Sequence, residues 1–299
     1  YSFYILPSVT EEQKEKFISG VNCVKPEGID ENFHQLFSHT VRQFVRHRQV
    51  WSSVQPMVTY QGSPSKKAPA FFGRKSIVQG EKILDDLSLF NTNPGKYLAY
   101  KYPEFYLDQV RGLQRRKFLQ EINRNIDSHG GITSLPKDSF NILGGEVHFL
   151  QEPGGKLRSI ASPFRIHQRA LQPLSLALYR LVSELPWDCT YDQSKAIPFI
   201  QSHLRQGGQV HSIDLSSATD YFPLSLQLTA LRAIFGNEER SIDLFEEISR
   251  SKWKSVIGEI QWKRGQPLGL YPSFAAFTLT HGLLLLHLAG CFNNQFFIV

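Results

Sequence analysis

The sequence contains little cysteine, and its cysteines are poorly placed for crosslinks or metal ions. Cys23, Cys189 and Cys291 are odd in number, far apart in the chain, and form no C-x-x-C pair. This excludes a disulfide framework and any recognisable zinc site, and it is typical of a reducing compartment. No basic segment followed by an apolar run precedes the first charged residues, so we expect no secretion signal.

Methionine is also scarce. Met57 is the single methionine, and the first residue is Tyr1. Because a native N-terminus normally carries methionine, the simplest expectation is that the sequence is part of a longer protein.

Charged residues are missing from the C-terminal part of the chain, where no Asp, Glu, Lys or Arg follows Arg264. A stretch of this length has to be considered as a transmembrane helix. Prolines and polar residues inside the stretch, and the absence of a basic cluster after it, oppose that interpretation. We therefore expect a helix that starts at Pro272, continues through Leu288 and is buried in the core of a large soluble domain.

The overall composition is that of a globular protein with a modest excess of positive charge. Hydrophobic residues make up 41% of the chain, which is enough for a sizeable core. The net charge of +6 permits an acidic partner but is too small to prove one. Basic residues gather in an amphipathic helix expected over residues 29–51, a Pro/Gly/Ser-rich loop at 61–75 and a helix expected over 104–127. Phosphate contacts and ordinary solvated surfaces are both compatible with these segments.

The stretch at residues 210–220, V-H-S-I-D-L-S-S-A-T-D, brings two carboxylates close together in the sequence. Residues 210–213 are short, partly β-branched and preceded by two glycines, which predicts a buried strand. Asp214 would lie at the end of that strand and Asp220 on the next turn, where a hard divalent cation finds oxygen ligands. Pro223 then opens a helix with leucines at helical spacing. In the alternative interpretation, Asp220 caps that helix and Asp214 starts a turn.

Residues 147–168 contain a segment that alternates around a tight P-G-G turn, which predicts a β-hairpin. Lys156 and Arg158 are two positions apart on the return strand, so they project to the same face. Two cations on one side of a rigid ribbon suit a triphosphate or a nucleic-acid backbone. A solvated basic edge is the alternative.

Further along the chain, residues 256–260 predict two short strands around a Gly-Glu turn. The loop at residues 265–273 follows, and its glycines Gly265 and Gly269 predict a flexible backbone that can approach a ligand closely. The last residues, 293–299, predict a turn that enters a buried strand.

Three of these stretches occur in a fixed order: E-P-G-G-K-L-R-S-I-A-S-P at residues 152–163, D-L-S-S-A-T-D-Y-F-P at 214–223, and G-Q-P-L-G-L-Y-P-S-F-A-A-F-T-L-T-H-G at 265–282. Together they resemble the F, A and B motifs of viral RNA-dependent RNA polymerases. The resemblance is greatest to mitoviruses, with narnaviruses and ourmia-like viruses as relatives. The segment D-C-T-Y-D-Q at residues 188–193 is also similar to a mitoviral segment between motifs F and A. The resemblance covers roughly residues 145–299.

The resemblance implies an α+β, right-hand polymerase fold with fingers and an incomplete palm, and with the thumb absent. Residues 1–144 would form an N-terminal extension and fingers, and residues 145–204 would form fingers with the motif F hairpin and the link to the palm. Residues 205–299 would be the incomplete palm with motifs A and B. Because the Gly-Asp-Asp of motif C does not occur, either the sequence is cut from a longer polymerase or a second chain supplies that motif. The 299-residue chain alone is then expected to be inactive.

The resemblance also implies residue roles, one position at a time. Asp214 matches the motif A aspartate, a catalytic residue that ligands Mg2+ or Mn2+. Asp220 matches the second motif A aspartate, which acts at the ribose of the incoming nucleotide. Lys156 and Arg158 match the motif F cations that hold the triphosphate.

The motif B loop carries the remaining implied contacts. Ser273 matches a nucleotide-binding position. Two departures from the mitoviral pattern are Pro272, where serine is usual, and Leu268, where methionine is usual. The first departure puts a contact with the ribose in doubt, whereas the second conserves volume. The positions that support the template and the nascent base pair are matched by Gly265, Gln266 and Gly269.

The implied partners are an RNA template with its nascent strand and nucleoside triphosphates, during replication of a positive-strand RNA virus genome in the mitochondrion or cytoplasm of a host. A reverse transcriptase is a distant alternative. It has a similar palm, but the sequences of its A and B motifs are different. The alternative from another functional class is a non-catalytic RNA-binding or membrane-associated replication protein. An in-frame Gly-Asp-Asp shortly downstream in the nucleotide sequence would favour the enzyme.

Replacing Lys156 or Arg158 with alanine is expected to raise the Michaelis constant for nucleoside triphosphates more than it weakens affinity for RNA. The reason is that both cations are predicted to face the triphosphate. Steady-state incorporation by a complete polymerase and a separate RNA titration measure the two effects. A loss confined to RNA affinity would instead assign these side chains to the nucleic-acid backbone.

Overall fold

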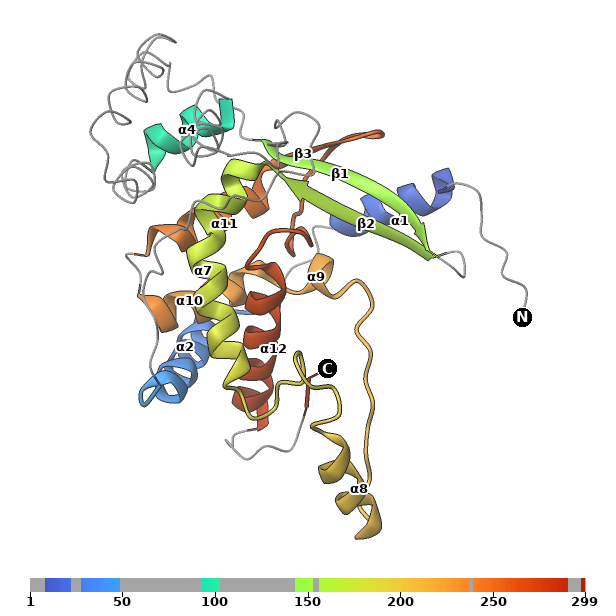
Figure 1. Cartoon of the computed structure of the whole chain (residues 1–299), viewed down its shortest axis with the longest axis vertical. Coiled ribbons are helices and arrows are strands. Elements are labelled where there is room, and N and C mark those ends of the chain that lie inside the picture. The colour runs from blue at the N-terminus through green and yellow to red at the C-terminus, as the bar shows by residue number, and fades with distance from the viewer. Residues whose placement is uncertain are drawn as a thin grey trace, which may run out of the picture.

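The computed structural model of the chain describes residues 9–22, 28–48, 93–102, 143–152, 156–236, 239–289 and 297–298. These residues form helices and one small sheet, in agreement with the expected α+β class (Figure 1). The described elements, in chain order, are α1 (Glu11–Val21), α2 (Glu31–Val45), α4 (Asn93–Lys101), β1 (Leu143–Glu152), β2 (Lys156–Pro163), α7 (Arg165–Ser183), α8 (Ile197–Arg205), α9 (Ala218–Tyr221), α10 (Leu224–Phe235), α11 (Arg240–Arg250), β3 (Lys252–Ser255), β4 (Gly258–Ile260) and α12 (Ser273–Ala289).

The sheet has its four strands in the order β2-β1-β3-β4. β1 and β2 pair antiparallel, with Glu152 opposite Lys156 at the turn, so the predicted hairpin is confirmed. β3 adds to the other edge of β1 in the parallel sense, and β4 pairs with β3 antiparallel. A side chain on Gly144 would collide with the ring of Trp253, so glycine allows β1 and β3 to approach closely.

The two short strands expected near residue 258 are confirmed as β3 and β4, but their turn lies earlier than predicted. Val256 and Ile257 form the turn, whereas the sequence analysis placed it at Gly258 and Glu259. Gly258 has a φ of +110° and is the first residue of β4. Ser255 fixes the turn, because its hydroxyl donates to the Gly258 carbonyl at 2.7 Å and accepts from the Ile257 N–H at 3.2 Å.

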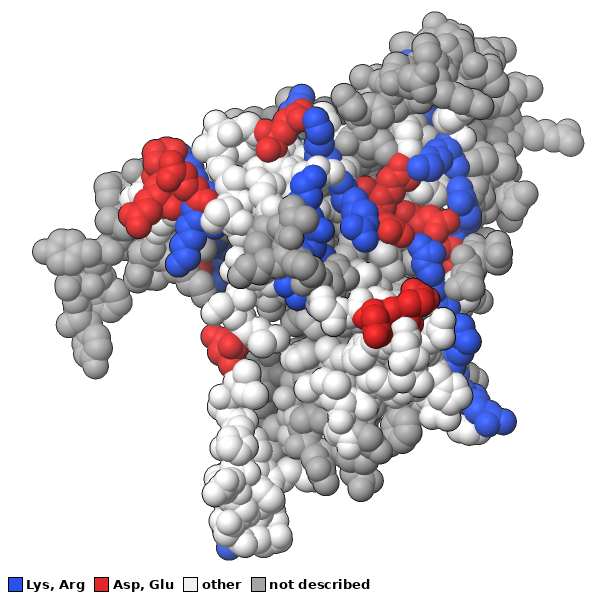
Figure 2. Space-filling model, turned by 180° about the vertical axis from the view of Figure 1, so that it is seen from behind, with Lys and Arg blue, Asp and Glu red and all other residues white. Residues whose placement is uncertain are grey.

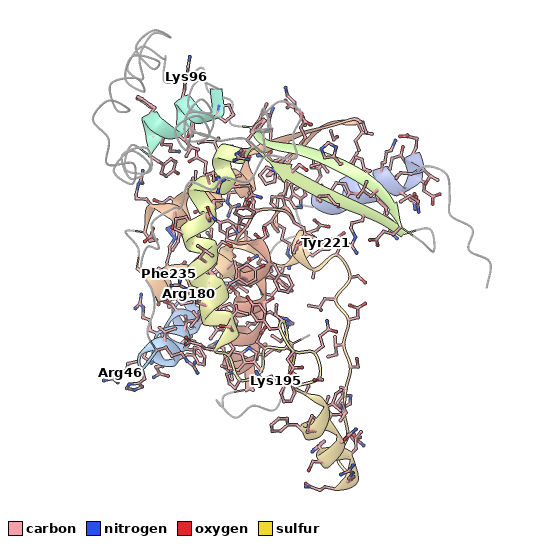
Figure 3. The ribbon with its side chains drawn as sticks, in the orientation of Figure 1. Arg46, Lys96, Arg180, Lys195, Tyr221 and Phe235 are labelled. Carbon is pink, nitrogen blue, oxygen red and sulfur yellow. The ribbon has the colours of Figure 1, made fainter. Side chains whose placement is uncertain are left out.

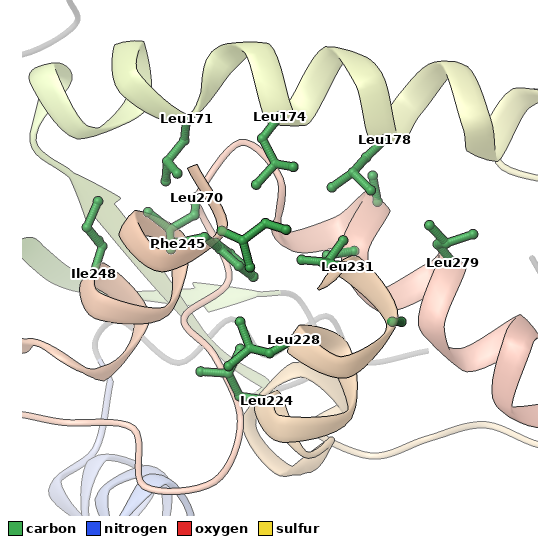
Figure 4. Close-up of a cluster of buried hydrophobic side chains, with 14 of the residues drawn as sticks. Leu171, Leu174, Leu178, Leu224, Leu228, Leu231, Phe245, Ile248, Leu270 and Leu279 are labelled. Atoms are coloured by element: carbon green, nitrogen blue, oxygen red, sulfur yellow. The ribbon is translucent and has the colours of Figure 1, made fainter. Parts of the chain in front are cut away.

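The helices beside the sheet enclose a core of leucines. α7 packs against α11 and α12, while α10 contacts α2, α11 and α12 (Figure 1). Burying one such side chain contributes about 1.5–3 kcal/mol, so this cluster holds the helices together. The side chains labelled in Figure 4 are Leu171, Leu174, Leu178, Leu224, Leu228, Leu231, Phe245, Ile248, Leu270 and Leu279.

α12 starts directly after Pro272, which confirms the helix predicted there. Polar side chains along it, including Thr278 and Thr280, are buried with the apolar ones. A side chain on Gly282 would collide with the indole of Trp187, so glycine lets this ring lie against the helix. None of the helices formed by the described residues is long and apolar enough to cross a membrane.

α2 confirms the amphipathic helix expected over residues 29–51, although it is shorter than predicted. Phe37 and Val41 are fully buried. Arg42 and Arg46 are exposed, as expected of the basic residues of an amphipathic helix.

Several features singled out in the sequence lie outside the described residues. These include the basic loop at residues 61–75, the helix expected at 104–127, and two of the cysteines, Cys23 and Cys291. Cys189 is buried as a free thiol, and burial raises its pKa. A buried, protonated thiol is a poor nucleophile, so Cys189 is a packing residue.

The buried strand predicted over residues 210–213 is wrong. The segment pairs with no strand among the described residues and is exposed, with Ile213 at 81%. It belongs to a long connection between α8 and α9, which Figure 1 shows running outside the helical layer. Because a strand is stable only when a neighbour satisfies its backbone groups, β-branched composition alone did not form one here.

The strand predicted near the C-terminal end appears as a short parallel bridge between Ile298 and Asp188. The Ile298 N–H donates to the Trp187 carbonyl at 2.9 Å, and the Cys189 N–H donates to the Ile298 carbonyl at 2.9 Å. Since residues 291–296 are not described, the prediction is confirmed at this bridge only.

Replacing Leu231 with alanine is expected to lower the free energy of unfolding by about 2–5 kcal/mol, because the fully buried side chain would leave a cavity. Leu36→Ala is the matched control, since Leu36 is 53% exposed and its loss should change stability by no more than about 0.5 kcal/mol. Urea titrations followed by circular dichroism measure both variants. Equal losses would show that the packing in Figure 4 does not stabilise the fold.

Candidate functional site

The loop at residues 265–273, called here the glycine loop, joins the three motif segments. At its start, the Gln266 N–H donates to the Thr219 carbonyl of α9 at 2.8 Å. At its middle, the Ala161 N–H of β2 donates to the Leu268 carbonyl at 3.1 Å. Backbone hydrogen bonds thus bring together segments that are far apart in the sequence.

Two glycines make these approaches possible. A side chain at Gly265 would collide with the carbonyl oxygens of Thr219 and Asp220, and one at Gly269 would collide with the Ala161 carbonyl. Gly269 also has a φ of +144°, which other residues rarely adopt. The sequence analysis expected a flexible loop open to a ligand, but these glycines let the loop lie tightly on protein backbone.

A buried polar network braces the glycine loop from inside. The Gln266 amide donates to Gln227 Oε1 at 2.7 Å and to the Ser273 carbonyl at 2.9 Å. The Ser273 hydroxyl lies 2.8 Å from the Pro267 carbonyl and 3.1 Å from Gln266 Oε1. Because Gln266 and Ser273 are both buried, their roles toward a template and a nucleotide stay predictions.

Helix α7 clamps the outer part of the loop through two side chains that the sequence analysis did not single out. Gln168 donates to the Gly269 carbonyl at 2.6 Å and accepts from the Tyr271 N–H at 2.8 Å. Ser175 donates to the Tyr271 carbonyl at 3.0 Å. Both residues follow the motif F hairpin in the chain, but nothing in their sequence pattern points to a loop about a hundred residues away.

Asp220 is held by an indole rather than used as a helix cap. The Trp262 Nε1–H donates to Asp220 Oδ1 at 2.7 Å, and no side chain caps α10, which starts after Pro223. Burial raises the pKa of Asp220, and the hydrogen bond from Trp262 partly offsets that rise. The carboxyl group is therefore held through one of its oxygens, next to the start of the glycine loop.

Asp214 lies on the exposed connection between α8 and α9, outside the contacts that the glycine loop makes with α9 and β2. Its carboxylate has the oxygen chemistry that Mg2+ prefers, but one ligand does not make a site. Within the part of the chain that the structure describes, no group of three or more His, Cys, Asp or Glu side chains could hold a metal ion. The carboxylate of Asp214 is a suitable ligand for a divalent cation, but the described residues do not bring enough further ligands together to bind one.

On the hairpin, Arg158 is half-exposed and forms an ion pair with Glu152. Arg158 Nε–H donates a hydrogen bond to this carboxylate, which raises the pKa of Arg158 further above its already high ordinary value. An exposed pair of this kind contributes little to stability, so another anion can replace Glu152 at small cost. The side chain of Lys156 is not among the described atoms, and the shared face predicted for the two cations remains a prediction.

Charges on the rear face of the molecule are mixed in sign. Figure 2 shows Lys and Arg interspersed with Asp and Glu over this face. The excess positive charge therefore does not create a uniform basic field on this face. Between α10 and α11, opposite charges also pair: Arg232 lies 3.3 Å from Asp243 and 2.9 Å from Glu246.

Comparisons with known proteins agree on one family. The model of the family described as mitovirus RNA-dependent RNA polymerase matches residues 75–294. The RNA-directed RNA polymerase of Cryphonectria parasitica mitovirus 1 (strain American chestnut tree/New Jersey/NB631) is 32% identical over 203 residues, which are 68% of the chain and 25% of that protein. An uncharacterized mitochondrial protein of Arabidopsis thaliana is 31% identical over 106 residues, which are 34% of the chain and 41% of that protein. The chain thus spans only part of the length of these relatives, and no solved structure matches it.

Replacing Gly269 with alanine is expected to destabilise the loop by about 2–4 kcal/mol, because the new methyl group meets the Ala161 carbonyl at a strained φ. Gly258→Ala is the matched control: its φ of +110° is also positive, but nothing lies within 4 Å of the added methyl group. Urea unfolding and hydrogen exchange of the Ala161 N–H measure the difference. If both variants lose the same stability and Ala161 stays protected, close approach of the loop to β2 is not required.

Proposed function

The chain belongs to the mitovirus RNA-dependent RNA polymerase family, and from this premise we propose that it is the part of such an enzyme that carries motifs F, A and B. The activity proposed for the complete protein is template-directed nucleotidyl transfer, in the replication of a positive-strand RNA virus genome. The observation that carries the proposal is the family match over residues 75–294. The glycine loop supports it, because it joins the same three segments that the motifs occupy.

In this proposal the right-hand layout keeps the boundaries expected from the sequence. Residues 1–144 are an N-terminal extension with fingers, and residues 145–204 are fingers with the hairpin and the link to the palm. Residues 205–299 are the incomplete palm. The β1-β2 hairpin and its backbone bond to the glycine loop are consistent with fingers that rest on a palm.

Asp214 is the proposed catalytic residue and metal ligand of the chain. A divalent cation, Mg2+ or Mn2+, supplies activation of the attacking 3′-oxygen and stabilisation of the leaving pyrophosphate when it is bound. Asp214 would hold it with an exposed carboxylate, and the remaining ligands would come from outside the described residues. A second chain that supplies motif C remains one source of those ligands.

The remaining proposed roles concern the nucleotide. Lys156 and Arg158 neutralise the triphosphate, and Arg158 can exchange its exposed partner Glu152 for phosphate oxygens. Asp220 meets the ribose, and Trp262 keeps its carboxyl group in one orientation for that contact. Each of these side chains acts by position and charge, while base pairing with the template selects the nucleotide.

The glycine loop positions the template side of the site. Gly265 and Gly269 bring the loop onto α9 and β2, and Gln266 and Ser273 brace it from the interior. We propose that Ser273 serves nucleotide binding and Gln266 serves template binding. Because both are buried, they act indirectly, by holding the loop in its shape. RNA and nucleoside triphosphates are the proposed partners, in the mitochondrion or cytoplasm of the host.

Replacing Asp214 with asparagine in a complete polymerase that contains this chain is expected to reduce nucleotide incorporation by at least about a thousandfold. The exposed side chain should be dispensable for the fold and for RNA binding, but a neutral amide is a poor ligand for a divalent cation. Primer extension, RNA titration and thermal unfolding measure the three properties.

Glu12→Gln is the control, because it removes one exposed carboxylate from α1, outside every motif segment, and should leave incorporation unchanged. Full activity of Asp214→Asn would refute the metal role. RNA binding without any template-dependent synthesis by the unaltered polymerase would favour the non-catalytic alternative.

A further inference from the structure

Trp262 lies in a cluster of aromatic rings that fixes its orientation. The residue is only 3% exposed. The centroid of its ring lies 5.9 Å from that of Trp253 in β3 and 6.0 Å from that of Phe17 in α1, and both contacts are edge-to-face. Phe17 in turn contacts Phe149 of β1, with the centroids 5.5 Å apart. Because such pairs favour particular orientations, a strand and a helix hold the indole between them.

Helix α1 also lies against α9, the helix that carries Asp220. A side chain on Gly20 of α1 would come within 2.9 Å of the Tyr221 hydroxyl, so the two helices are in close contact there. Tyr221 is labelled in Figure 3, and Figure 1 shows α1 beside the β1-β2 hairpin. One residue after Trp262, the Lys263 N–H donates at 3.0 Å to the carbonyl of the last residue of α1. α1 therefore contacts the segments that carry both partners of the bond between Trp262 and Asp220.

The hydrogen bond from Trp262 leaves one oxygen of Asp220 for a further partner. An indole N–H can only donate, so it uses Oδ1 as an acceptor. Within the described part of the chain, no group donates to Oδ2. Asp220 is half-buried, and a carboxylate oxygen that lacks a donor is unfavourable away from water. A ligand hydroxyl that donates to Oδ2 would complete the hydrogen bonding of this group.

We propose that Trp262, held in place by Phe17, is a positioning residue that makes the site select ribonucleotides over deoxyribonucleotides. This inference rests on the proposed function, in which Asp220 meets the ribose. With Oδ1 occupied by the indole, Oδ2 is the oxygen that accepts from the 2′-hydroxyl. A deoxyribonucleotide has no such hydroxyl and leaves Oδ2 without a donor. Sites built to hydrogen-bond a substrate group reject an analogue that lacks it.

Part of this support comes from a region that the family match does not include. The match covers residues 75–294, whereas Phe17 belongs to α1, at Glu11–Val21. The other ring against Trp262 comes from β3, so the indole lies where the N-terminal helix meets the sheet. A helix near the start of the chain thus tunes a nucleotide contact made far along it.

The test uses a complete polymerase that contains this chain. It compares kcat/KM for a ribonucleoside triphosphate with kcat/KM for its 2′-deoxy counterpart. Trp262→Phe keeps an aromatic ring but removes the N–H, and should lower the preference for the ribonucleotide by about 10- to 100-fold. The loss should lie in ribonucleotide incorporation, with deoxyribonucleotide incorporation unchanged within about threefold. Phe17→Ala should lower the preference by about 3- to 10-fold, because the indole loses the support on one side.

Phe33→Ala is the matched control for Phe17→Ala. Phe33 is also a partly buried ring on an N-terminal helix, but it packs edge-on against His287, with centroids 5.1 Å apart. It should cost similar stability in thermal unfolding and leave the preference unchanged. An equal fall in preference for both variants would assign the effect to general loosening of the fold and overturn the inference. Phe17→Ala leaves the indole itself intact, so it decides the question if Trp262→Phe does not fold.

A double-mutant cycle with Asp220→Ala tests whether Trp262 acts through this carboxyl group. Asp220→Ala alone should remove most of the preference, and adding Trp262→Phe should change it by less than about twofold. A further fall as large as in the unaltered background would show that Trp262 acts by another route, and would overturn the inference.

Failure of this inference and failure of the proposed function give different results. A polymerase that prefers ribonucleotides equally with and without the Trp262 N–H would keep the proposed function and overturn the inference. A polymerase that does not distinguish the two sugars would do the same. No template-dependent synthesis by the unaltered complete polymerase would refute the proposed function, and the inference with it.

Discussion

The close approach of the glycine loop to two other backbones is the constraint on which the site depends. At Gly265 and at Gly269, any side chain would occupy the space of a carbonyl oxygen on α9 or β2. The hydrogen bonds at Thr219 and Ala161 can form only because that space is empty. The hairpin, α9 and α12 therefore keep one mutual arrangement, and every proposed role at the site requires it.

The interior of the loop adds specificity at some expense in stability. Gln227, Gln266 and Ser273 place amide and hydroxyl groups in a core that is mostly apolar. Most of these groups are hydrogen bonded, but Gln227 Nε2 is buried without a partner among the described residues, which costs about 1–3 kcal/mol. An apolar core would be more stable, yet it would not fix the loop in a single conformation.

Features set by neighbouring residues were predictable from the sequence, whereas features set by distant partners were not. The β1-β2 hairpin, α10 and α12 follow from a P-G-G turn, leucine spacing and Pro223 or Pro272, all of which act locally. The strand at residues 210–213 was predicted wrongly because a strand also needs a neighbour, and composition does not supply one. For the same reason, the sequence pattern gave no sign that Trp262 binds Asp220 or that Gln168 clamps the loop. The two carboxylates, the two hairpin cations and the two loop glycines were singled out from local patterns, whereas Gln266 and Ser273 were added by resemblance. The chemical roles of all these residues remain predictions.

The parallel pairing of β1 with β3 has a consequence for how the chain is made. Leu143 in β1 pairs with Lys252 in β3, so the two strands are synthesised more than a hundred residues apart. At roughly 5–20 residues per second, β1 waits on the order of 5–20 s for its parallel neighbour. Throughout that interval the hairpin has an open edge that can join any other strand within reach. The ribosome, by its pace through α7 to α11, therefore sets how long the nascent protein is exposed to aggregation.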